Sequence, residues 1–321
     1  MLKLLPKALF VLLAIFCFVL IFPSKLTNDQ PFVNFNLKSL LQPKPQPVKL
    51  LFTGDLSYDR YIRQMGEENG FESILENLTL FLNDFDLVIA NLESPITTNK
   101  SVSIYTQIGS PPNYIFTSPP ITTKMLNQNN ISVVNLGNNH ILNQGQSGLN
   151  QTIDFLDKAN IEYFGNINSL VSPSYLIKRV RGVKIGLVNY NQFSADSYNS
   201  AIKDIKTVKP QVDLLILNSH WGIEYTPIAN QTIQNLAHQF IDAGVDLIIG
   251  VHPHVIQQTE TYKQKQIYYS LGNFVFDQYF SQATQKGLLV EVNIDPKTLD
   301  LTFKDHYVSM NFPGGQTELV K

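Results

Sequence analysis

The stretch Asp246-Leu-Ile-Ile-Gly-Val-His-Pro-His254 decides how the rest of the chain is interpreted. Its short apolar run, residues 247–249, is typical of a buried strand in a parallel sheet. A glycine breaks the apolar pattern, and His252 and His254 follow with Pro253 between them. Alternate side chains of an extended backbone point to the same side, and proline favours extended geometry in the preceding residue. We therefore expect the two imidazoles to converge, either as metal ligands or as hydrogen-bonded loop histidines.

The same arrangement, a short apolar strand followed at once by polar side chains, recurs at four other places. We expect these strands at residues 49–53, 86–90, 131–136 and 213–217, with helical segments between them. Alternating strands and helices are typical of an α/β fold, in which ligands bind where parallel strands end. The polar residues after the five strands are therefore expected to meet in space, and they are Asp55, Asn91, Glu93, Asn138, Asn139, His140, His220, His252 and His254.

Each of these signals has a plainer explanation when taken alone. Gly54-Asp55 after a strand is common turn chemistry. Asn91 and Asn138 could cap helices or adopt left-handed backbone. His220 could be a core histidine with one hydrogen bond. Five independent coincidences at five strand ends are harder to accept than one shared site, so we favour a site.

The donor types at these strand ends indicate which metals could bind. Carboxylates, amide oxygens and imidazoles without sulfur suit Zn, Mn or Fe, and three histidines argue against a plain Mg site. His238, within a predicted helix, and His306, in a late strand, match no such pattern. Both are interpreted as structural.

Further elements complete the predicted α/β domain, which we place at residues 48–309 with a C-terminal tail at 310–321. A Pro- and Ser-rich loop over residues 94–120 is too long for a simple connection and is expected to form a lid or wall of the site. The other expected elements are helices at 71–82, 121–128, 145–159 and 229–243, a hairpin at 175–188 that turns at Arg181-Gly182, and late strands at 267–271, 288–294 and 301–308.

Composition excludes several classes of protein. The 321 residues are 44% hydrophobic and 16% charged, which is typical of a folded chain and not of a disordered one. A net charge of −2 without a basic stripe argues against nucleic acid as a partner. The single cysteine, Cys17, lies in an N-terminal apolar run, so a disulfide within the chain is excluded and a thiolate metal site is not expected.

Residues 1–25 have the character of a membrane segment. Lys3 and Lys7 precede an apolar run over residues 8–22. The run is short beside the roughly 20 residues of a spanning helix, and a cleaved signal peptide has the same layout. No small residues suited to cleavage follow it, so we favour an uncleaved signal anchor. The positive-inside rule keeps the lysines cytoplasmic, which places the Pro-rich tether at 26–47 and the globular domain outside the cell membrane.

Six short motifs, in this order along the chain, resemble those of the CapA family. They are Gly54-Asp55, Asn91-Leu-Glu93, Asn138-Asn-His140, His220-Trp-Gly222 with Glu224, His252-Pro-His254 and Ser270-Leu-Gly-Asn-Phe274. CapA proteins serve capsule (poly-γ-glutamate) synthesis and are related to calcineurin-like metallophosphoesterases. The resemblance covers residues 49–276. It implies a four-layer α/β/β/α sandwich with a dinuclear metal centre between the loop ends of its sheets.

The resemblance also implies roles for individual residues. Asp55 and His254 would hold one metal. Asn139, His220 and His252 would hold the other, with Glu93 between the two. His140 would correspond to the histidine that assists protonation of the leaving group. The residues expected to bind substrate are Asn91, Asn138, Trp221, Glu224 and Asn273.

Three positions depart from the patterns that these families show. The histidine of the phosphoesterases' first Asp-x-His motif is absent, because Ser57 stands in its place. Glu93 replaces the bridging aspartate of the phosphoesterases. Asn143 stands where an aspartate often follows the Asn-Asn-His motif of CapA proteins. The first two differences concern one metal position, so the resemblance is compatible with one divalent ion or two.

Two functions are compatible with these residues. One is a metal-dependent hydrolase or transferase that acts on phosphoester or γ-glutamyl bonds during assembly of an extracellular polymer. The other is a non-catalytic accessory subunit of a polymer synthase, which binds an anionic chain in the same cleft. His140 beside the expected ligands favours the enzyme, and the missing first-motif histidine favours the binder. Analogy of fold does not separate them.

Overall fold

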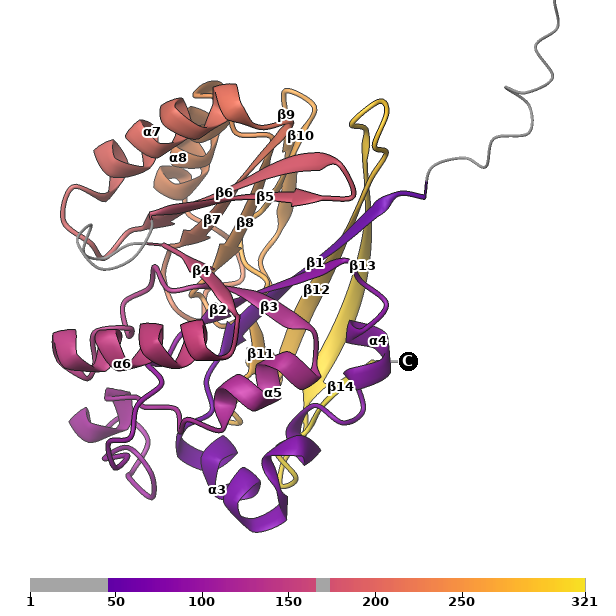
Figure 1. The fold of residues 1–321 in the computed structure, drawn as a ribbon. Coiled ribbons are helices and arrows are strands. Elements are labelled where there is room, and N and C mark those ends of the chain that lie inside the picture. Colours follow the sequence, from indigo (N-terminus) through magenta and orange to yellow (C-terminus); the bar gives the residue numbers. More distant parts are fainter. Residues whose placement is uncertain (1–45, 166–173, 321) are drawn as a thin grey trace, which may run out of the picture. The chain divides into compact units, whose positions relative to one another are not determined.

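The computed structural model describes residues 46–165 and 174–320, which form two β-sheets between layers of helices (Figure 1). The predicted membrane segment at 1–25 lies outside the described residues, as does nearly all of the predicted tether. Among the residues that are described, no helix is both long and apolar enough to cross a membrane.

The first sheet has eight strands. Their bounds are β1 Val48–Leu56, β2 Leu87–Leu92, β3 Ile131–Asn135, β4 Glu162–Phe164, β11 Asn273–Val275, β12 Lys286–Ile294, β13 Leu301–Met310 and β14 Thr317–Leu319. The strand order is β14-β13-β12-β1-β2-β3-β4, and β11 also pairs with β1. Strands β1 to β4 are parallel, so β1, β2 and β3 end at the same edge.

The second sheet has six strands. Their bounds are β5 Tyr175–Val180, β6 Val183–Asn191, β7 Leu214–His220, β8 Leu247–Val251, β9 Thr259–Tyr262 and β10 Lys265–Tyr268, in the order β5-β6-β7-β8-β10-β9. Strands β6, β7 and β8 are parallel, and the expected hairpin joins β5 to β6. The predicted strand at 247–249 is thus part of a central strand, β8, and His252 and His254 follow it.

Helices cover the outer face of each sheet, which gives four layers (Figure 1). Residues of α3, α4, α5 and α6 belong to the apolar cluster on the outer face of the first sheet, and residues of α7 and α8 to the cluster on that of the second. The helix bounds are α3 Arg60–Asn69, α4 Thr79–Leu82, α5 Thr122–Gln128, α6 Gly145–Lys158, α7 Ser197–Val208 and α8 Gln231–Asp242.

Three buried apolar clusters lie between these four layers. Along β1, Leu51 belongs to the cluster under the helices, while Leu50 and Phe52 belong to the cluster between the sheets, as the alternation of a strand requires. The middle cluster also contains Ile216 of β7 and Ile249 of β8. Because both faces of the central strands are buried, these strands have the unbroken apolar sequences from which they were predicted. The described residues therefore form the expected α/β/β/α arrangement.

The helix expected at 71–82 is wrong. Helix α3 precedes that segment and ends before Gly70, whose φ is 88°. The segment itself holds a short 3-10 helix, Phe71–Ile74, and the single turn of α4. Between them, Leu75 has φ −120° and ψ 10°, which interrupts the helix. The 3-10 helix and α4 together bury the apolar residues of this segment. Their helical spacing therefore did not require one continuous helix.

The C-terminal residues belong to the fold. Strand β13 continues to Met310, beyond the predicted domain end at 309. Strand β14 pairs antiparallel with it, so that Met310 lies opposite Thr317. The folded domain therefore extends into residues 310–320, which were predicted to form a tail. This return strand is three residues long and carried no recognisable sequence signal.

The Asp246 carboxylate, just before β8, forms hydrogen bonds with three other segments of the chain. One carboxylate oxygen, Oδ2, accepts hydrogen bonds from Lys209 Nζ at 2.6 Å and from the Leu215 backbone N–H at 2.9 Å. The other, Oδ1, accepts from Lys265 Nζ at 2.8 Å. Burial alone would raise the pKa of Asp246, but the two lysines and the backbone donor outweigh it and lower the pKa below its usual value.

We expect Asp246→Asn to lower the free energy of unfolding by about 2 kcal/mol at pH 7, because hydrogen bonds to a buried carboxylate are lost. Because the pKa of Asp246 is lower in the folded state, its carboxylate stabilises the fold at pH values above the unfolded-state pKa of about 3.9. This contribution disappears as the pH falls through the folded-state pKa, so parent and variant should converge below pH 4. Urea denaturation across this pH range checks the effect. Asp154→Asn, in an exposed pair with Lys158, is the control; equal losses in both variants would contradict the role of Asp246.

Candidate metal centre

The polar ends of the strands meet between the two sheets. Asp55 Oδ2 accepts a hydrogen bond from the His252 backbone N–H at 3.1 Å, which joins the end of β1 to the residue after β8. The Asp55 backbone N–H donates to the Gly272 carbonyl at 3.0 Å. A Cβ on Gly54 would overlap that same carbonyl. Only glycine before Asp55 allows the two segments to approach this closely.

Two groups of potential metal-ligand atoms form at this junction, and Glu93 belongs to both. Asp55, Glu93 and His254 make the first group, and Glu93, His220 and His252 make the second. Within each group the ligand atoms all lie within 4.8 Å of one another. Glu93 Oε1 is 3.7 Å from His254 Nε2 and 3.9 Å from His220 Nε2. The structure thus brings these residues together in the two sets that the family resemblance implies.

Asn139 faces the second group. Its Oδ1 accepts a hydrogen bond from His220 Nε2 at 2.8 Å, so the amide oxygen lies at the edge of the second group. An amide oxygen is a suitable ligand for the harder divalent metals. Asn139 therefore lies beside the second group, and its role as a metal ligand stays a prediction.

The backbone at residues 252–254 is not extended as had been expected. Both have positive φ, 97° for His252 and 57° for His254, so this segment is a tight turn and not an extended strand end. The turn sends the two imidazoles to different ligand groups, both of which include Glu93. Convergence was predicted correctly, but from the wrong local geometry. Such strain in non-glycine residues is typical of functional sites.

The surroundings of the Glu93 carboxylate indicate whether these residues fit a metal. The Glu93 side chain is 0% exposed, yet neither carboxylate oxygen has a hydrogen-bond partner among the described residues. The Nδ1 of His252 is likewise buried without a partner. A buried carboxylate without donors is costly, and a bound cation offsets that cost. The two Glu93 oxygens, which lack donors and lie among the other ligand atoms, therefore fit a divalent metal.

Burial and neighbouring ionisable groups shift the pKa values of the three buried histidines. Burial lowers the pKa of His220 well below its usual range and that of His252 to about 3, and neighbouring histidines add to both shifts. Burial also opposes charge on His254, but the carboxylates of Glu93 and Asp55 outweigh it and raise its pKa to about 9. At pH 7, His220 and His252 are therefore already in the neutral form that a metal requires, and His254 would release a proton on binding.

Three buried asparagines hold the ligands in place. Asn91 Nδ2 donates to Asp55 Oδ1 at 2.7 Å. Asn273 Oδ1 lies 2.9 Å from His254 Nδ1, which leaves the other ring nitrogen to face Glu93. Asn138 fixes the following turn by accepting the backbone N–H groups of the next residues. The expected substrate contact of these asparagines is corrected to a positioning role, since all three are buried.

His140 lies beside the two ligand groups and belongs to neither. Its Nδ1 is 3.0 Å from Asn143 Oδ1, which also accepts the Phe116 backbone N–H at 2.8 Å. Because that amide oxygen can only accept, Nδ1 carries the ring proton, and Nε2 is left to exchange a proton with a ligand. Burial lowers the pKa of His140 to about 4, so the ring is neutral at pH 7.

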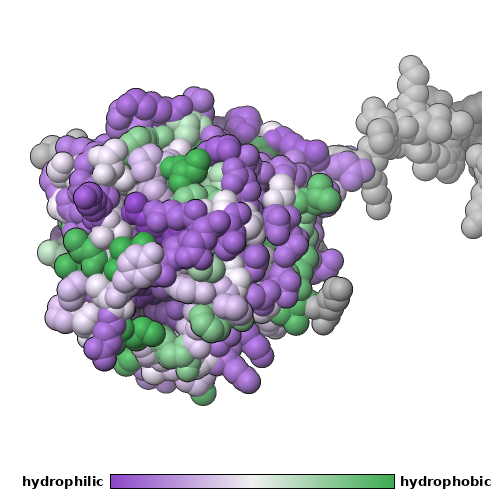
Figure 2. All heavy atoms as spheres, turned by 90° about the horizontal axis from the view of Figure 1, so that it is seen from below, coloured by the Kyte–Doolittle hydropathy of each residue, from purple (hydrophilic) through white to green (hydrophobic). Residues whose placement is uncertain are grey.

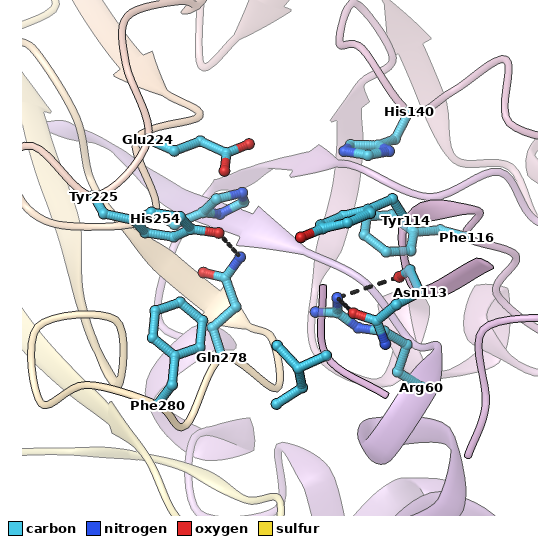
Figure 3. Close-up of a pocket in the computed structure, with 11 residues that line it drawn as sticks. Arg60, Asn113, Tyr114, Phe116, His140, Glu224, Tyr225, His254, Gln278 and Phe280 are labelled. Carbon is cyan, nitrogen blue, oxygen red and sulfur yellow. Dashed lines mark hydrogen bonds between the residues drawn. The ribbon is translucent and has the colours of Figure 1, made fainter. Parts of the chain in front are cut away.

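A small pocket opens beside the first ligand group (Figure 3). His254 and His140 reach it from the strand ends, and Glu224 reaches it from the loop after β7. The loop at 94–120 supplies part of the wall, as expected, through Ile108, Asn113, Tyr114 and Phe116. Glu224 is thus placed where it could contact a substrate, as predicted.

Trp221 does not reach this pocket. Its side chain is 0% exposed and packs in the cluster under α7 and α8, where Nε1 donates to the Tyr269 carbonyl at 2.9 Å. Neighbouring residues at a strand end face opposite ways, so the ring points away from the site that His220 faces. The expected substrate contact of Trp221 is therefore corrected to a role in the core.

The two histidines interpreted as structural lie in neither ligand group. His238 Nε2 is 2.7 Å from Glu260 Oε1, and His306 Nε2 is 2.8 Å from Glu291 Oε2. Each therefore has a carboxylate partner within the fold, in agreement with the structural interpretation.

Sequence reasoning missed Arg60, which also lines the pocket. Its guanidinium donates to Asn113 Oδ1 at 3.2 Å and pairs with Asp277. The same group lies over the rings of Phe116, at 4.9 Å, and Phe276, at 5.1 Å. The partners come from two segments of the chain that are distant from Arg60 in sequence, so no local motif could have indicated it.

The profile of the family described as bacterial capsule synthesis protein PGA_cap matches residues 49–278. The chain belongs to this family. The matched residues contain every member of both ligand groups, and they coincide with the part of the chain in which the CapA motifs were recognised. The predicted resemblance is confirmed.

Curated relatives of this PGA_cap chain include two proteins named CapA. The PGA biosynthesis protein CapA of Bacillus subtilis (strain 168) is 30% identical over 254 residues, which cover 74% of this chain and 66% of the relative. The capsule biosynthesis protein CapA of Bacillus anthracis is 28% identical over 265 residues, with 76% and 63% covered. This chain thus spans slightly less than two thirds of the length of these relatives.

Solved structures share the fold. A structure described as a novel phosphatase from Mycoplasma pneumoniae has a TM-score of 0.51 over 84% of this chain and 96% of that chain. Sequence identity is 16%, so the likeness concerns the fold alone.

Proposed function

We propose that this PGA_cap protein is a metal-dependent hydrolase or transferase of capsule or poly-γ-glutamate biosynthesis, which acts on phosphoester or γ-glutamyl bonds of an anionic polymer. The observation that carries the proposal is Glu93, a buried carboxylate without hydrogen-bond donors that is shared by two groups of ligand atoms. The names of the CapA relatives supply the biosynthetic context.

One or two divalent ions, Mn, Zn or Fe, would bind at these groups. Asp55, Glu93 and His254 would hold the first. Glu93, His220 and His252 would hold the second, together with Asn139. A metal bound there would supply Lewis-acid chemistry, by polarising an oxygen of the scissile bond and lowering the pKa of a water.

His140 would act as the general acid that protonates the leaving group. The Nδ1–H donated to Asn143 fixes the ring, so that Nε2 is the atom that takes up a proton and returns it to the leaving group. Glu224, on the far side of the pocket from Arg60, would contact the substrate (Figure 3).

The proposal is tested with the full chain, prepared without chelator and assayed for Mn²⁺-dependent hydrolysis of bis(p-nitrophenyl) phosphate. His252→Ala and His254→Ala each remove a ligand from a different group. Each should weaken Mn²⁺ binding by at least about tenfold and lower hydrolysis in parallel, because the remaining ligands no longer converge. Metal analysis of the purified variants gives the stoichiometry that each mutation leaves.

His238→Ala is the matched control, because this histidine pairs with Glu260 outside the site. Unchanged Mn²⁺ content in both His252→Ala and His254→Ala would refute the metal assignment. Mn²⁺ binding without any hydrolysis would favour the accessory role, in which the cleft binds an anionic chain for a polymer synthase.

The location of the chain is part of the proposal. An N-terminal anchor at 1–25 would hold the domain on the extracytoplasmic side of the cell membrane, where the polymer is assembled and synthase subunits could be met. Protease added to intact spheroplasts should then cut near residues 43–47 and release the globular domain. A domain that is cut only after the membrane has been opened would be cytoplasmic, and this part of the proposal would fail.

A further inference from the structure

Tyr225, in the loop after β7, lines the pocket at the metal centre and is held there by backbone and ring contacts. Its φ is 62°, a strained value for a non-glycine residue, and its backbone N–H donates to the Pro253 carbonyl at 2.8 Å. Its ring stacks on that of the ligand His254, with 6.2 Å between centroids, and Phe280 packs edge-on against it at 5.2 Å. Strain of this kind persists only where the surroundings maintain it, and it is typical of functional sites.

A chain of hydrogen bonds leads from His254 to the Tyr225 hydroxyl. Asn273 Nδ2 donates at 2.8 Å to the Thr284 backbone carbonyl, which can only accept, so Oδ1 of the same amide must face His254 Nδ1. Asn273 Nδ2 also donates to Gln278 Oε1 at 3.1 Å. The amide nitrogen of Gln278 therefore faces Tyr225 and donates to the hydroxyl oxygen at 3.3 Å (Figure 3). A backbone carbonyl thus fixes the direction of every bond in the chain.

This direction makes Tyr225 a donor toward the pocket. Because the hydroxyl oxygen accepts from Gln278, its proton is available to a further acceptor, either the Glu224 carboxylate or a ligand. The hydroxyl points to the middle of the pocket in Figure 3. A tyrosine with the ordinary pKa of about 10 is protonated at pH 7, and burial and then the charge of Glu224 raise the pKa of Tyr225 further.

The hydroxyl can be reached from solvent. Tyr225 is 42% exposed, and Ile108 and Phe280, which line the same pocket, are more than half exposed. Figure 2 shows exposed apolar side chains as green patches on one face of the domain. Apolar side chains at the mouth offer no hydrogen bonds, so a few polar groups inside the pocket must orient a ligand.

We infer that the Tyr225 hydroxyl donates a hydrogen bond to a substrate oxygen beside the first ligand group, and that Gln278 is the positioning residue that sets the direction of this donor. The inference rests on the proposed function and adds to it a residue in contact with the reacting group. A donor that is aimed before the reaction begins contributes most where negative charge develops on the oxygen. Cleavage of a phosphoester and of an amide both place negative charge on such an oxygen, so the role is the same for either bond.

Tyr225→Phe tests the contact, because it keeps the ring and removes only the hydroxyl. Mn²⁺-dependent hydrolysis of bis(p-nitrophenyl) phosphate by the full chain should slow by about 10²- to 10³-fold in kcat, the usual effect of losing one such donor. Mn²⁺ content should not change, since Tyr225 belongs to neither ligand group. Tyr279→Phe is the matched control. It loses the same atom from a hydroxyl that has no hydrogen-bond partner among the described residues, outside the pocket, and should keep the parent rate.

Gln278→Glu tests the direction of the chain. A carboxylate can accept from Asn273 as the amide does, but it cannot donate to Tyr225 and would instead take up the hydroxyl proton. Hydrolysis should therefore slow about as much as in Tyr225→Phe. In a chain that already carries Tyr225→Phe, Gln278→Glu should slow kcat by less than about twofold, because no hydroxyl is left to redirect. An effect of the added charge or of altered packing would act equally in both backgrounds.

Binding of inorganic phosphate, measured by calorimetry with and without Mn²⁺, tests the same contact without turnover. Tyr225→Phe should weaken phosphate binding by about tenfold or more, because a hydrogen bond to a charged oxygen is lost. The inference is overturned if the parent binds no phosphate, if Tyr225→Phe binds it as tightly as the parent, or if Gln278→Glu acts equally with and without the Tyr225 hydroxyl.

The two readouts separate this inference from the proposed function. Phosphate binding that requires Tyr225, in a chain that hydrolyses nothing, would support the contact and refute the enzymatic proposal. Mn²⁺-dependent hydrolysis that Tyr225→Phe leaves unchanged would support the enzyme and refute the contact.

Discussion

Replacement of Glu93 by glutamine is expected to abolish tight Mn²⁺ binding while leaving the metal-free protein at least as stable as the parent. Glutamine keeps the shape of the side chain and removes its charge. Burial and, after it, the charge of Asp55 raise the pKa of Glu93 well above its usual range, which shows how unfavourable the ionised form is without a cation. The variant loses the charge that a metal needs and also the cost of burying it.

The size of the effect follows from linkage between binding and folding. A ligand at 100 to 1,000 times its Kd stabilises the folded state by about 2.7 to 4.1 kcal/mol. We expect Mn²⁺ to raise the free energy of unfolding of the parent by about this amount, and of Glu93→Gln by less than about 0.5 kcal/mol at the same metal concentration. Urea denaturation in Mn²⁺ and in chelator measures both differences.

Glu93→Asp is the control for this variant, because it keeps the charge and shortens the side chain by one methylene. It should retain part of the Mn²⁺ stabilisation. The role of Glu93 as the shared ligand would be refuted if Glu93→Gln gained as much stability from Mn²⁺ as the parent. A large loss of stability in chelator would instead show that Glu93 has donors that stabilise the fold.

His140→Ala should slow hydrolysis by about 10²- to 10⁴-fold, the usual contribution of a general acid or base, with metal content nearly unchanged. The hydrolysis rate and the metal content should respond differently because of where His140 lies. His140 lies in the pocket, outside both ligand groups, and is held by Asn143 and packed against the Phe116 ring at 4.3 Å between centroids. Steady-state kinetics and metal analysis on the same preparation measure the two effects.

Asn143→Ala is a useful companion variant. It removes the acceptor that orients the ring but leaves the imidazole, so it should slow hydrolysis less than His140→Ala does. If His140→Ala lost its metal, His140 would be a ligand and the two-group assignment would need revision. If turnover were unchanged, the residue would have no part in the reaction.

The sequence predicted the centre of the fold well because the central strands are buried on both faces. Runs such as residues 247–249 are then apolar without interruption and can be recognised locally. Polar residues directly after such runs were therefore expected in one site, and the resemblance to the CapA family implied how they divide into the two ligand groups.

What the sequence could not indicate depends on contacts between distant segments. The positive φ angles of His252 and His254 are imposed by packing of the turn against β1, so alternation along an extended strand gave the wrong geometry. Trp221 adjoins a ligand in sequence and turns into the core. Arg60 lies in no motif and reaches the pocket only because α3 packs beside the loop at 94–120.

The central claim, that Glu93 is shared by metal positions between the two sheets, is tested most directly by anomalous diffraction from crystals of the protein grown with Mn²⁺. We expect one or two anomalous peaks in contact with the Glu93 carboxylate. One would lie beside Asp55 and His254, and the other beside His220 and His252. Crystals with ordered Mn²⁺ elsewhere and no peak at Glu93, or with a donor hydrogen-bonded to that carboxylate in place of a metal, would contradict the claim.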